Sequence, residues 1–428
     1  MGLYRNKKSQ VGVDDKWSQF IYSNVLESIH CPFNLVDIYR SILGAREIDV
    51  TNFESPKNKI ITIHPFASTK KKSWPMTKWS ELIQKVLSED KEVEINIVGA
   101  KNDTDLAQRI IDNPILRIFN KRIHSYVGIN SIEDTFNLLS ESHLFIGHDS
   151  MVSHLAGLFR MPSLVLSLGT VRPHETTPYN DRVVNLVPRN KCFPCTPSQA
   201  CDLLPCHNSL NVEAVSQITM NMLKASHFDK DSLYPNLSPM QIGSMDIFTT
   251  SYDEAGLKLS EINNNATSGK DIFKTLYRVI WSYYLNNKEI TSDIPSFNKD
   301  NVEFFHHHLE GTKHLFELYS HGFHFCNNVL DESEKETPSV KIIQDRVSQI
   351  AEIDELTTIT KKAYPLLAPL VDFFFVNKAN AAGENIIEIT NNNLIAFHEA
   401  SNITAILNDL LSKTVGPQID TNGITKEV

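Results

Sequence analysis

Hydrophobic and polar residues follow two alternating periods between about residues 58 and 226. The short β-branched run "KIITIH" is typical of a buried strand, and the following "TKWSELIQKVLSED" places its apolar residues on one helical face: Trp79, Leu82, Ile83, Val86 and Leu87. Further strands are predicted at "VEINIVGA", "LFIG" and "PSLVLSLG", and further helices at "DTDLAQRIIDN", "SIEDTFNLLSES" and "MVSHLAGLFR". This alternation predicts an α/β domain, in which helices cover both faces of a parallel sheet.

The segments on either side of this block have different patterns. Residues 1–57 contain two helical patterns and no strand followed by a glycine-rich turn. In residues 229–428, amphipathic stretches such as "DIFKTLYRVIWSYYLNN" and "NITAILNDLLSKTV" are separated by loops rich in Asn, Ser and Thr, which predicts an α-helical C-terminal domain. A chain of 428 residues exceeds one ordinary core, so we expect three parts: 1–57, 58–226 and 229–428.

Composition narrows the class of protein and its partners. The formal net charge of -10 argues against a nucleic-acid partner, which would require a basic face. The N-terminus lacks the apolar core of a signal peptide, and no apolar run is long enough to be a transmembrane segment. We therefore expect a cytoplasmic protein.

Polar residues cluster where the strand "LFIG" is predicted to end, in "GHDSMVSH". Ligands of parallel sheets bind beyond the carboxyl ends of the strands, where helix N-termini attract anions. Ser150 could hold a phosphate there, and Asp149 could orient sugar hydroxyls, with His154 one turn further along. The simpler alternative is that Asp149 or Ser150 only caps the helix and that His154 is a core histidine.

A basic segment, "HPFASTKKKSWPMTKW", follows the first predicted strand and therefore lies at the same edge of the sheet. It offers Ser68 and three consecutive lysines, Lys70, Lys71 and Lys72. A lysine beside a helix N-terminus is suited to neutralising a diphosphate leaving group. The alternative is that the lysine run is a solvated surface.

Four of the six cysteines are close together in the sequence. Cys192, Cys195, Cys201 and Cys206 have the spacing C-x2-C-x5-C-x4-C, which can close four thiolates around a structural Zn or Fe ion. The alternative is four unligated thiols. In a reducing compartment, clustered thiols favour a metal over disulfides.

Three segments together resemble a known family: "HPFASTKKKSWPMTKWSELI", "FIGHDSMVSHLAGLFRMPSLVLSLGTVRPHETTPY" and "CFPCTPSQACDLLPC". In this order and spacing they are similar to the donor half of the family 9 glycosyltransferases, the lipopolysaccharide heptosyltransferases, over about residues 33–225. The resemblance implies a Rossmann-like GT-B donor-binding domain. It also implies transfer of a sugar, with inversion, from a nucleotide diphosphate donor of the ADP-heptose type, without a catalytic metal.

The resemblance also implies roles for single residues. Ser68 and Lys72 match the serine and lysine that hold the donor diphosphate, and Gly99 matches the glycine beside the nucleoside. Asp103 is a further candidate for a ribose contact. The acidic, hydroxyl and histidine positions of the donor-binding loop are matched by Asp149, Ser150 and His154.

Two departures from the family pattern bear on function. Family members usually carry glycine at the positions of Phe66 and Met151, where the backbone approaches the donor. The acceptor half, with its glycine-rich turn and catalytic base, has no counterpart before "NLVDIYRSILGA", so the catalytic residues are unknown and residues 1–57 are expected to be a remnant of that half or a link to it.

Two functional hypotheses follow. The first is a glycosyltransferase that acts on a glycan or protein acceptor. The second is a non-catalytic nucleotide-sugar-binding or scaffold protein that has lost the acceptor half. The complete set of Ser68, Lys72, Asp149 and His154 favours the enzyme. In both cases the helical domain would provide acceptor recognition or a homo-oligomer contact, because its pattern offers no site for chemistry.

Overall fold

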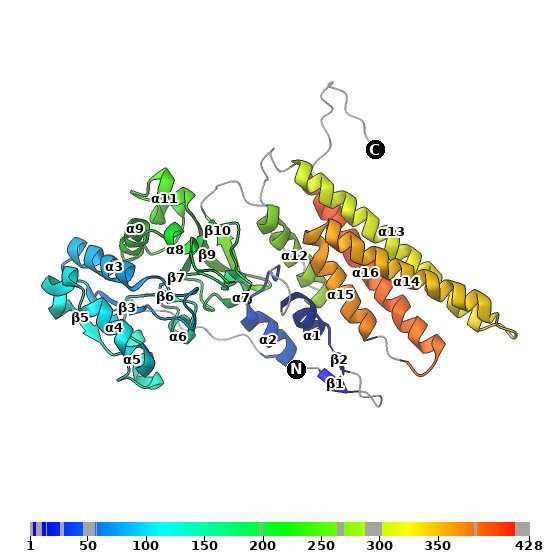
Figure 1. Ribbon diagram of the computed structural model, residues 1–428, viewed down its shortest axis with the longest axis horizontal. Helices are drawn as coiled ribbons and strands as arrows, with labels where there is room; N and C mark the ends of the chain where they lie inside the picture. The colour runs from blue at the N-terminus through cyan, green and yellow to red at the C-terminus, as the bar shows by residue number, and fades with distance from the viewer. Residues whose placement is uncertain are drawn as a thin grey trace, which may run out of the picture. The chain divides into compact units, whose positions relative to one another are not determined.

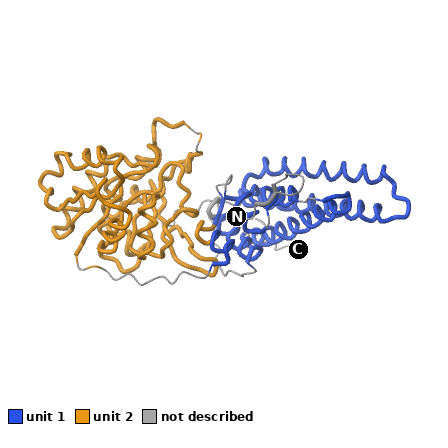
Figure 2. Tube along the Cα trace, turned by 90° about the horizontal axis from the view of Figure 1, so that it is seen from below, with its two compact units in different colours: residues 1–32, 38–45, 266–428 blue, residues 33–37, 46–265 orange. Residues whose placement is uncertain are grey.

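The computed structural model describes residues 3–5, 11–13, 15–25, 30–45, 56, 58–196, 198, 200–262, 269–286, 302–380 and 383–415. The chain divides into two compact units, coloured separately in Figure 2. The α/β unit comprises Phe33–Asp37 and Arg46–Asn265, and the helical unit comprises Met1–Pro32, Ile38–Ala45 and Ala266–Val428. The α/β unit therefore extends about 40 residues beyond the end at residue 226 that the sequence pattern predicts.

An eight-stranded sheet forms the centre of the α/β unit, in the order β10-β9-β8-β7-β6-β3-β4-β5 (Figure 1). Strands β3 to β8 are parallel to one another, which confirms the predicted parallel sheet, and β9 and β10 extend it in antiparallel fashion beyond β8. The strands are β3 Ile60–His64, β4 Glu94–Ile97, β5 Ile123–Ser125, β6 Leu144–His148, β7 Ser163–Leu166, β8 Val183–Pro188, β9 Met245–Asp253 and β10 Gly256–Glu261.

Strands β9 and β10 correct the expectation that residues 229–428 are wholly helical. Met245 and Ile247 of β9 are fully buried, two residues apart, and both join the core under the sheet. This spacing has the period of a strand, because successive side chains of a strand point to opposite faces. Polar neighbours such as Thr249 and Ser251 conceal the period in the sequence.

Helices cover both faces of the sheet, as predicted. Leu144 and Ile146 of β6 pack in the core beneath α3, α4 and α9, whereas Phe145 packs in a second core with α5 and α6. This alternation explains why β6 is buried along its whole length. The helices of the unit are α3 Met76–Glu89, η2 Lys101–Asp103, α4 Thr104–Ile111, η3 Pro114–Arg122, α5 Ile132–Ser140, α6 Met151–Leu158, α7 Pro173–Thr176, α8 Cys206–Ser209, α9 Val212–Met222, α10 Lys230–Leu233 and α11 Pro239–Gly243.

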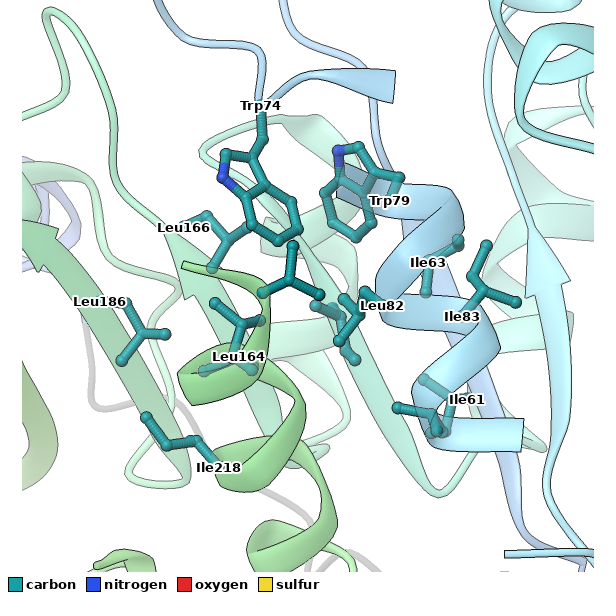
Figure 3. Close-up of a cluster of buried hydrophobic side chains, with 14 of the residues drawn as sticks. Ile61, Ile63, Trp74, Trp79, Leu82, Ile83, Leu164, Leu166, Leu186 and Ile218 are labelled. Atoms are coloured by element: carbon teal, nitrogen blue, oxygen red, sulfur yellow. The ribbon is translucent and has the colours of Figure 1, made fainter. Parts of the chain in front are cut away.

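The larger core is built around two tryptophans. Figure 3 shows Trp74 and Trp79 with Leu82 of α3, and Leu164 and Leu166 of β7 in the same cluster. The rings of Trp74 and Trp79 meet edge to face, with centroids 5.5 Å apart, and both side chains are fully buried. All five residues of the apolar face predicted for α3 are buried.

The order of the strands creates a topological switch point between β3 and β6. From β3 the chain proceeds outward to β4 and β5, and then returns to the other side of β3 as β6. His64, the last residue of β3, pairs in register with Gly147 of β6. The loop after β3 and the turn after β6 therefore leave the sheet side by side, at the place where α/β sheets bind ligands.

The helical unit contains long antiparallel helices and a small two-stranded sheet that the sequence pattern did not predict. One helix ends at Ala363 and the next α-helix begins at Ala368, because Pro365 between them cannot continue a helix. No helix within the described ranges is long and apolar enough to span a bilayer. Its elements are β1 Leu3–Arg5, β2 Val11–Val13, α1 Lys16–Phe20, η1 Ile21–Val25, α12 Gly269–Asn286, α13 Val302–Ser333, α14 Val340–Ala363, η5 Pro365–Leu367, α15 Ala368–Ala379 and α16 Ile386–Val415; α2 Leu35–Leu43 spans both units.

Candidate functional site

Lys72 and Asp149 come together at the switch point, although they are far apart in the sequence. Lys72 Nζ lies 3.5 Å from Asp149 Oδ2, and His154 Nε2 lies 3.7 Å from Asp149 Oδ1. The Asp149 side chain is 12% exposed, whereas that of His154 is 47% exposed. The lysine thus reaches the carboxylate from the β3 loop, and the histidine reaches it from the first turn of α6. Three of the predicted site residues form one charged cluster.

Ser150 brings the N-terminus of α6 to the same cluster. It is the N-cap residue of α6, and its backbone N–H donates to Ser153 Oγ at 3.2 Å. Its own hydroxyl is directed at the sheet, with Oγ 3.1 Å from His64 Nδ1. The free N–H groups of the first turn and the helix dipole make this end of α6 favourable for an anion.

Ser68 and Gly99 follow neighbouring strands of the sheet, and within the described ranges neither forms a hydrogen bond or ion pair with the cluster. Ser68 is exposed on the loop after β3. Gly99 follows β4, and a Cβ atom placed there would lie 2.6 Å from Cε2 of Phe66. The Phe66 ring is buried and occupies the space that a side chain at Gly99 would need. Asp103 Oδ2 accepts a hydrogen bond from the Ala100 N–H at 2.9 Å, so this carboxylate is engaged within its own turn.

The two departures from the family pattern differ in structure. Phe66 is 3% exposed and packs edge to face against His64, with ring centroids 5.7 Å apart, so it is part of the core. Met151 is 55% exposed at the start of α6. Only Met151 therefore presents its side chain to the solvent beside the charged cluster.

Buried histidines surround the cluster. Burial lowers the pKa of His64 to about 4 and that of His148 to about 3, from an ordinary value of 6.5. Both rings are therefore neutral near pH 7. His148 accepts a hydrogen bond from the Trp74 N–H at 3.0 Å, and His207 Nε2 lies 3.0 Å from the Lys71 carbonyl oxygen. The sequence motifs predict no role for His148 and His207, although "GHDS" contains a polar residue, His148, at the buried end of a strand.

We expect the chain to lose stability as the pH falls from 6.5 towards 4. The unfolded state binds protons at His64 and His148 below pH 6.5, whereas the folded state does so only near pH 4 and pH 3. Between pH 6 and pH 5, each of the two histidines should lower the free energy of unfolding by about 1 kcal/mol. Urea unfolding at a series of pH values measures this, and a stability that is constant or rises between pH 6 and pH 5 would contradict it.

The cysteine loop does not have the geometry of the predicted metal site. Within the ranges that the structure describes, no group of three or more His, Cys, Asp or Glu side chains is arranged to hold a metal ion. Burial raises the pKa of the Cys195 and Cys206 thiols, and the neighbouring thiols raise it further. The prediction of a Zn or Fe ion thus depends on the cysteine spacing alone. Elemental analysis of protein purified without added metal tests it.

The cysteine loop contacts Gly169, which lies against the turn at residues 71–74. This turn carries Lys72 and is called the lysine turn below. The Cys195 N–H donates to the Gly169 carbonyl at 2.8 Å, and Gly169 in turn lies against the Lys71 backbone. The Trp74 indole N–H donates to the carbonyl oxygens of His207 and Leu210, at 3.3 and 3.0 Å. The third sequence motif thus contacts the second through Gly169, and the residues that follow the third motif contact Trp74 of the first.

Comparison with known proteins finds a family model that matches part of the chain. Residues 40–204 match the model of glycosyltransferase family 9 (heptosyltransferase). This segment is similar to family 9. This match confirms the resemblance drawn from the three motifs. The matched residues, called the family 9 segment below, extend from α2 into the cysteine loop. No curated protein sequence matches the chain at a significant level.

Three solved structures are similar to part of the chain. They are the ADP-heptose LPS heptosyltransferase II of Escherichia coli (14% identity, 50% of this chain, TM-score 0.34), a family 9 glycosyltransferase of Veillonella parvula (12%, 50%, 0.32) and the E. coli heptosyltransferase WaaC with ADP (18%, 44%, 0.32). In each case the alignment covers 54% of the other protein. The chain thus spans about half the length of these relatives.

Proposed function

We propose that the family 9 segment binds the diphosphate of a nucleotide-linked sugar beside Lys72, Asp149, Ser150 and His154. The observation that carries the proposal is the cluster itself, in which a lysine, a carboxylate and the N-terminus of α6 meet at the switch point of the sheet. Lys72 and the free N–H groups of α6 supply positive charge for the phosphates. Asp149 is suited to accepting hydrogen bonds from sugar hydroxyls.

The proposed reaction is transfer of the glycosyl group to a glycan or protein acceptor, with inversion at the anomeric carbon. An acceptor oxygen attacks that carbon, the bond to the diphosphate breaks, and the acceptor proton passes to a base. The Lys72 ammonium would stabilise the negative charge that develops on the leaving diphosphate. An ADP-linked heptose is the proposed donor, and lipopolysaccharide synthesis the proposed context, because relatives of the chain are ADP-heptose-dependent lipopolysaccharide heptosyltransferases.

Phe66 favours a second candidate, a nucleotide-sugar-binding protein without turnover. Its ring packs on Gly99, the glycine that the family pattern assigns to the nucleoside, and thereby reduces the room beside the end of β4. Release of labelled sugar from ADP-heptose distinguishes the candidates, since a binding protein retains donor affinity but neither transfers nor hydrolyses the sugar.

Replacing Lys72 by alanine should weaken ADP binding by about 1.5–3 kcal/mol, the usual range for a hydrogen bond to a charged group. This corresponds to roughly a tenfold to 150-fold rise in Kd. Isothermal calorimetry at about 0.15 M salt measures it, because salt at this level screens the contribution of distant charges.

Lys85→Ala is the matched control for this experiment. It removes the same charge from the same unit, at a residue of α3 whose only recorded ion-pair partner among the described residues is Glu213. The control should bind ADP like the wild type. Equal ADP affinity in Lys72→Ala and Lys85→Ala would reject the proposed site.

A further inference from the structure

Two buried imidazoles hold the backbone on both sides of Lys72. On one side, the Lys71 carbonyl oxygen lies 3.0 Å from His207 Nε2. On the other side, the Trp74 N–H lies 3.0 Å from His148 Nε2. His148 is fully buried and His207 is 4% exposed, and the bond between Trp74 and His148 is itself buried. The turn that carries Lys72 is thus attached to the protein interior immediately before and two residues after the lysine.

The partners of each ring determine its tautomer. A carbonyl oxygen can only accept, so His207 carries its proton on Nε2. The Trp74 N–H can only donate, so Nε2 of His148 is unprotonated and its Nδ1–H donates to the Leu166 carbonyl at 3.2 Å. The two histidines therefore perform opposite tasks: His207 supplies a donor to the turn, and His148 supplies an acceptor.

The bond from Trp74 also fixes the distance between Lys72 and Asp149. His148 directly precedes Asp149, and Trp74 lies two residues after Lys72, so the hydrogen bond from the Trp74 backbone to the His148 side chain links the two segments that carry the ion pair. A lysine side chain has four rotatable bonds, and ordering it costs conformational entropy. With its backbone anchored, Lys72 has fewer arrangements to lose when an anion binds.

We propose that His148 and His207 are positioning residues of the anion site, which hold the Lys71–Trp74 turn so that Lys72 faces Asp149. The inference rests on the proposed function and extends it to two residues that do not touch the ligand. It gives a role to histidines that the three sequence motifs leave unassigned.

A matched pair of substitutions separates positioning from general stability. In His148→Gln, the terminal amide oxygen reaches the place of Nε2 and can accept from the Trp74 N–H. In His148→Asn, the shorter amide reaches only the place of Nδ1, so it can donate to Leu166 but leaves Trp74 without its acceptor. We expect His148→Asn to raise the Kd for ADP about tenfold, the value of one net hydrogen bond, and His148→Gln to recover most of that loss.

The same pair of substitutions at His207 tests a hydrogen-bond donor instead of an acceptor. His207→Gln retains an amide donor near the place of Nε2, whereas His207→Asn does not reach the Lys71 carbonyl. Urea unfolding of all four variants shows how far each substitution destabilises the fold. Hydrogen exchange of the Trp74 amide provides a readout that needs no ligand, and His148→Asn should lose protection that His148→Gln retains.

The outcomes distinguish this inference from the proposed function. If the wild-type chain fails to bind ADP, the proposed function is rejected and the positioning role with it. If the wild type binds ADP and Lys72→Ala weakens binding, but the Asn and Gln variants bind equally well, the positioning role alone is rejected. Equal loss in both variants, in proportion to their lost stability, would likewise reduce the histidines to structural residues.

Discussion

Replacing Trp74 by alanine is expected to destabilise the α/β unit by about 3–5 kcal/mol, the range for large aromatic residues truncated in a core. The side chain is fully buried, and its ring packs against Trp79. Its indole N–H also satisfies the carbonyl oxygens of His207 and Leu210, which the substitution would leave without this donor. Urea unfolding followed by far-UV circular dichroism measures the loss without depending on tryptophan fluorescence.

Trp74→Phe separates the packing contribution from the hydrogen bonds. The phenyl ring preserves most of the buried apolar surface and leaves the backbone N–H for His148, so only the indole donor is lost. We expect this variant to lose about 0.5–1.5 kcal/mol, the net contribution of a hydrogen bond, because Lys78 Nζ also donates to the carbonyl oxygens of His207 and Leu210. Equal losses for Trp74→Phe and Trp74→Ala would mean that ring packing is not what stabilises this position.

Gly169→Ala should both destabilise the fold and impair the anion site. Gly169 has a φ of +64°, a conformation that costs a residue with a Cβ atom roughly 1–2 kcal/mol. The added Cβ would also lie 2.8 Å from the Lys71 carbonyl oxygen, so the backbone of the lysine turn must move. Because Lys72 is the next residue, we expect the Kd for ADP to rise about tenfold or more, in line with a charged hydrogen bond that is weakened or lost.

Gly44→Ala is the control for the backbone strain in this experiment. Gly44 has a φ of +58°, but a Cβ atom placed there meets nothing within 4 Å. This variant should show the cost of the positive φ alone and bind ADP normally. If Gly169→Ala binds ADP as well as Gly44→Ala does, the lysine turn does not depend on its contact with Gly169.

The βα units were predictable because their periods are local. The apolar face of α3 was read from residues three and four apart, and burial on one side of a helix requires this spacing. β9 was not predictable from its pattern because Thr249 and Ser251 occupy the same face as Met245 and Ile247, so polar residues interrupt the apolar period and resemble loop composition.

The charged cluster was partly predictable, since Lys72 and Asp149 follow strands whose carboxyl ends share one edge. The hydrogen bonds that hold the lysine turn were not predictable, because each joins two residues that lie far apart in the sequence. His148 and Trp74 are separated by 74 positions, and His207 and Lys71 by 136, and no period links them. The cysteine spacing gave a metal as the expectation, whereas the structure shows the loop packed on the lysine turn.

A crystal structure of the full chain with bound ADP tests the central claim most directly. The diphosphate is predicted to lie between Lys72 Nζ and the N-terminus of α6, with phosphate oxygens within hydrogen-bonding distance of the lysine and of the backbone N–H groups around Ser150. ADP bound with its phosphates away from both groups, or no ADP bound at a saturating concentration, would contradict the assignment of this site.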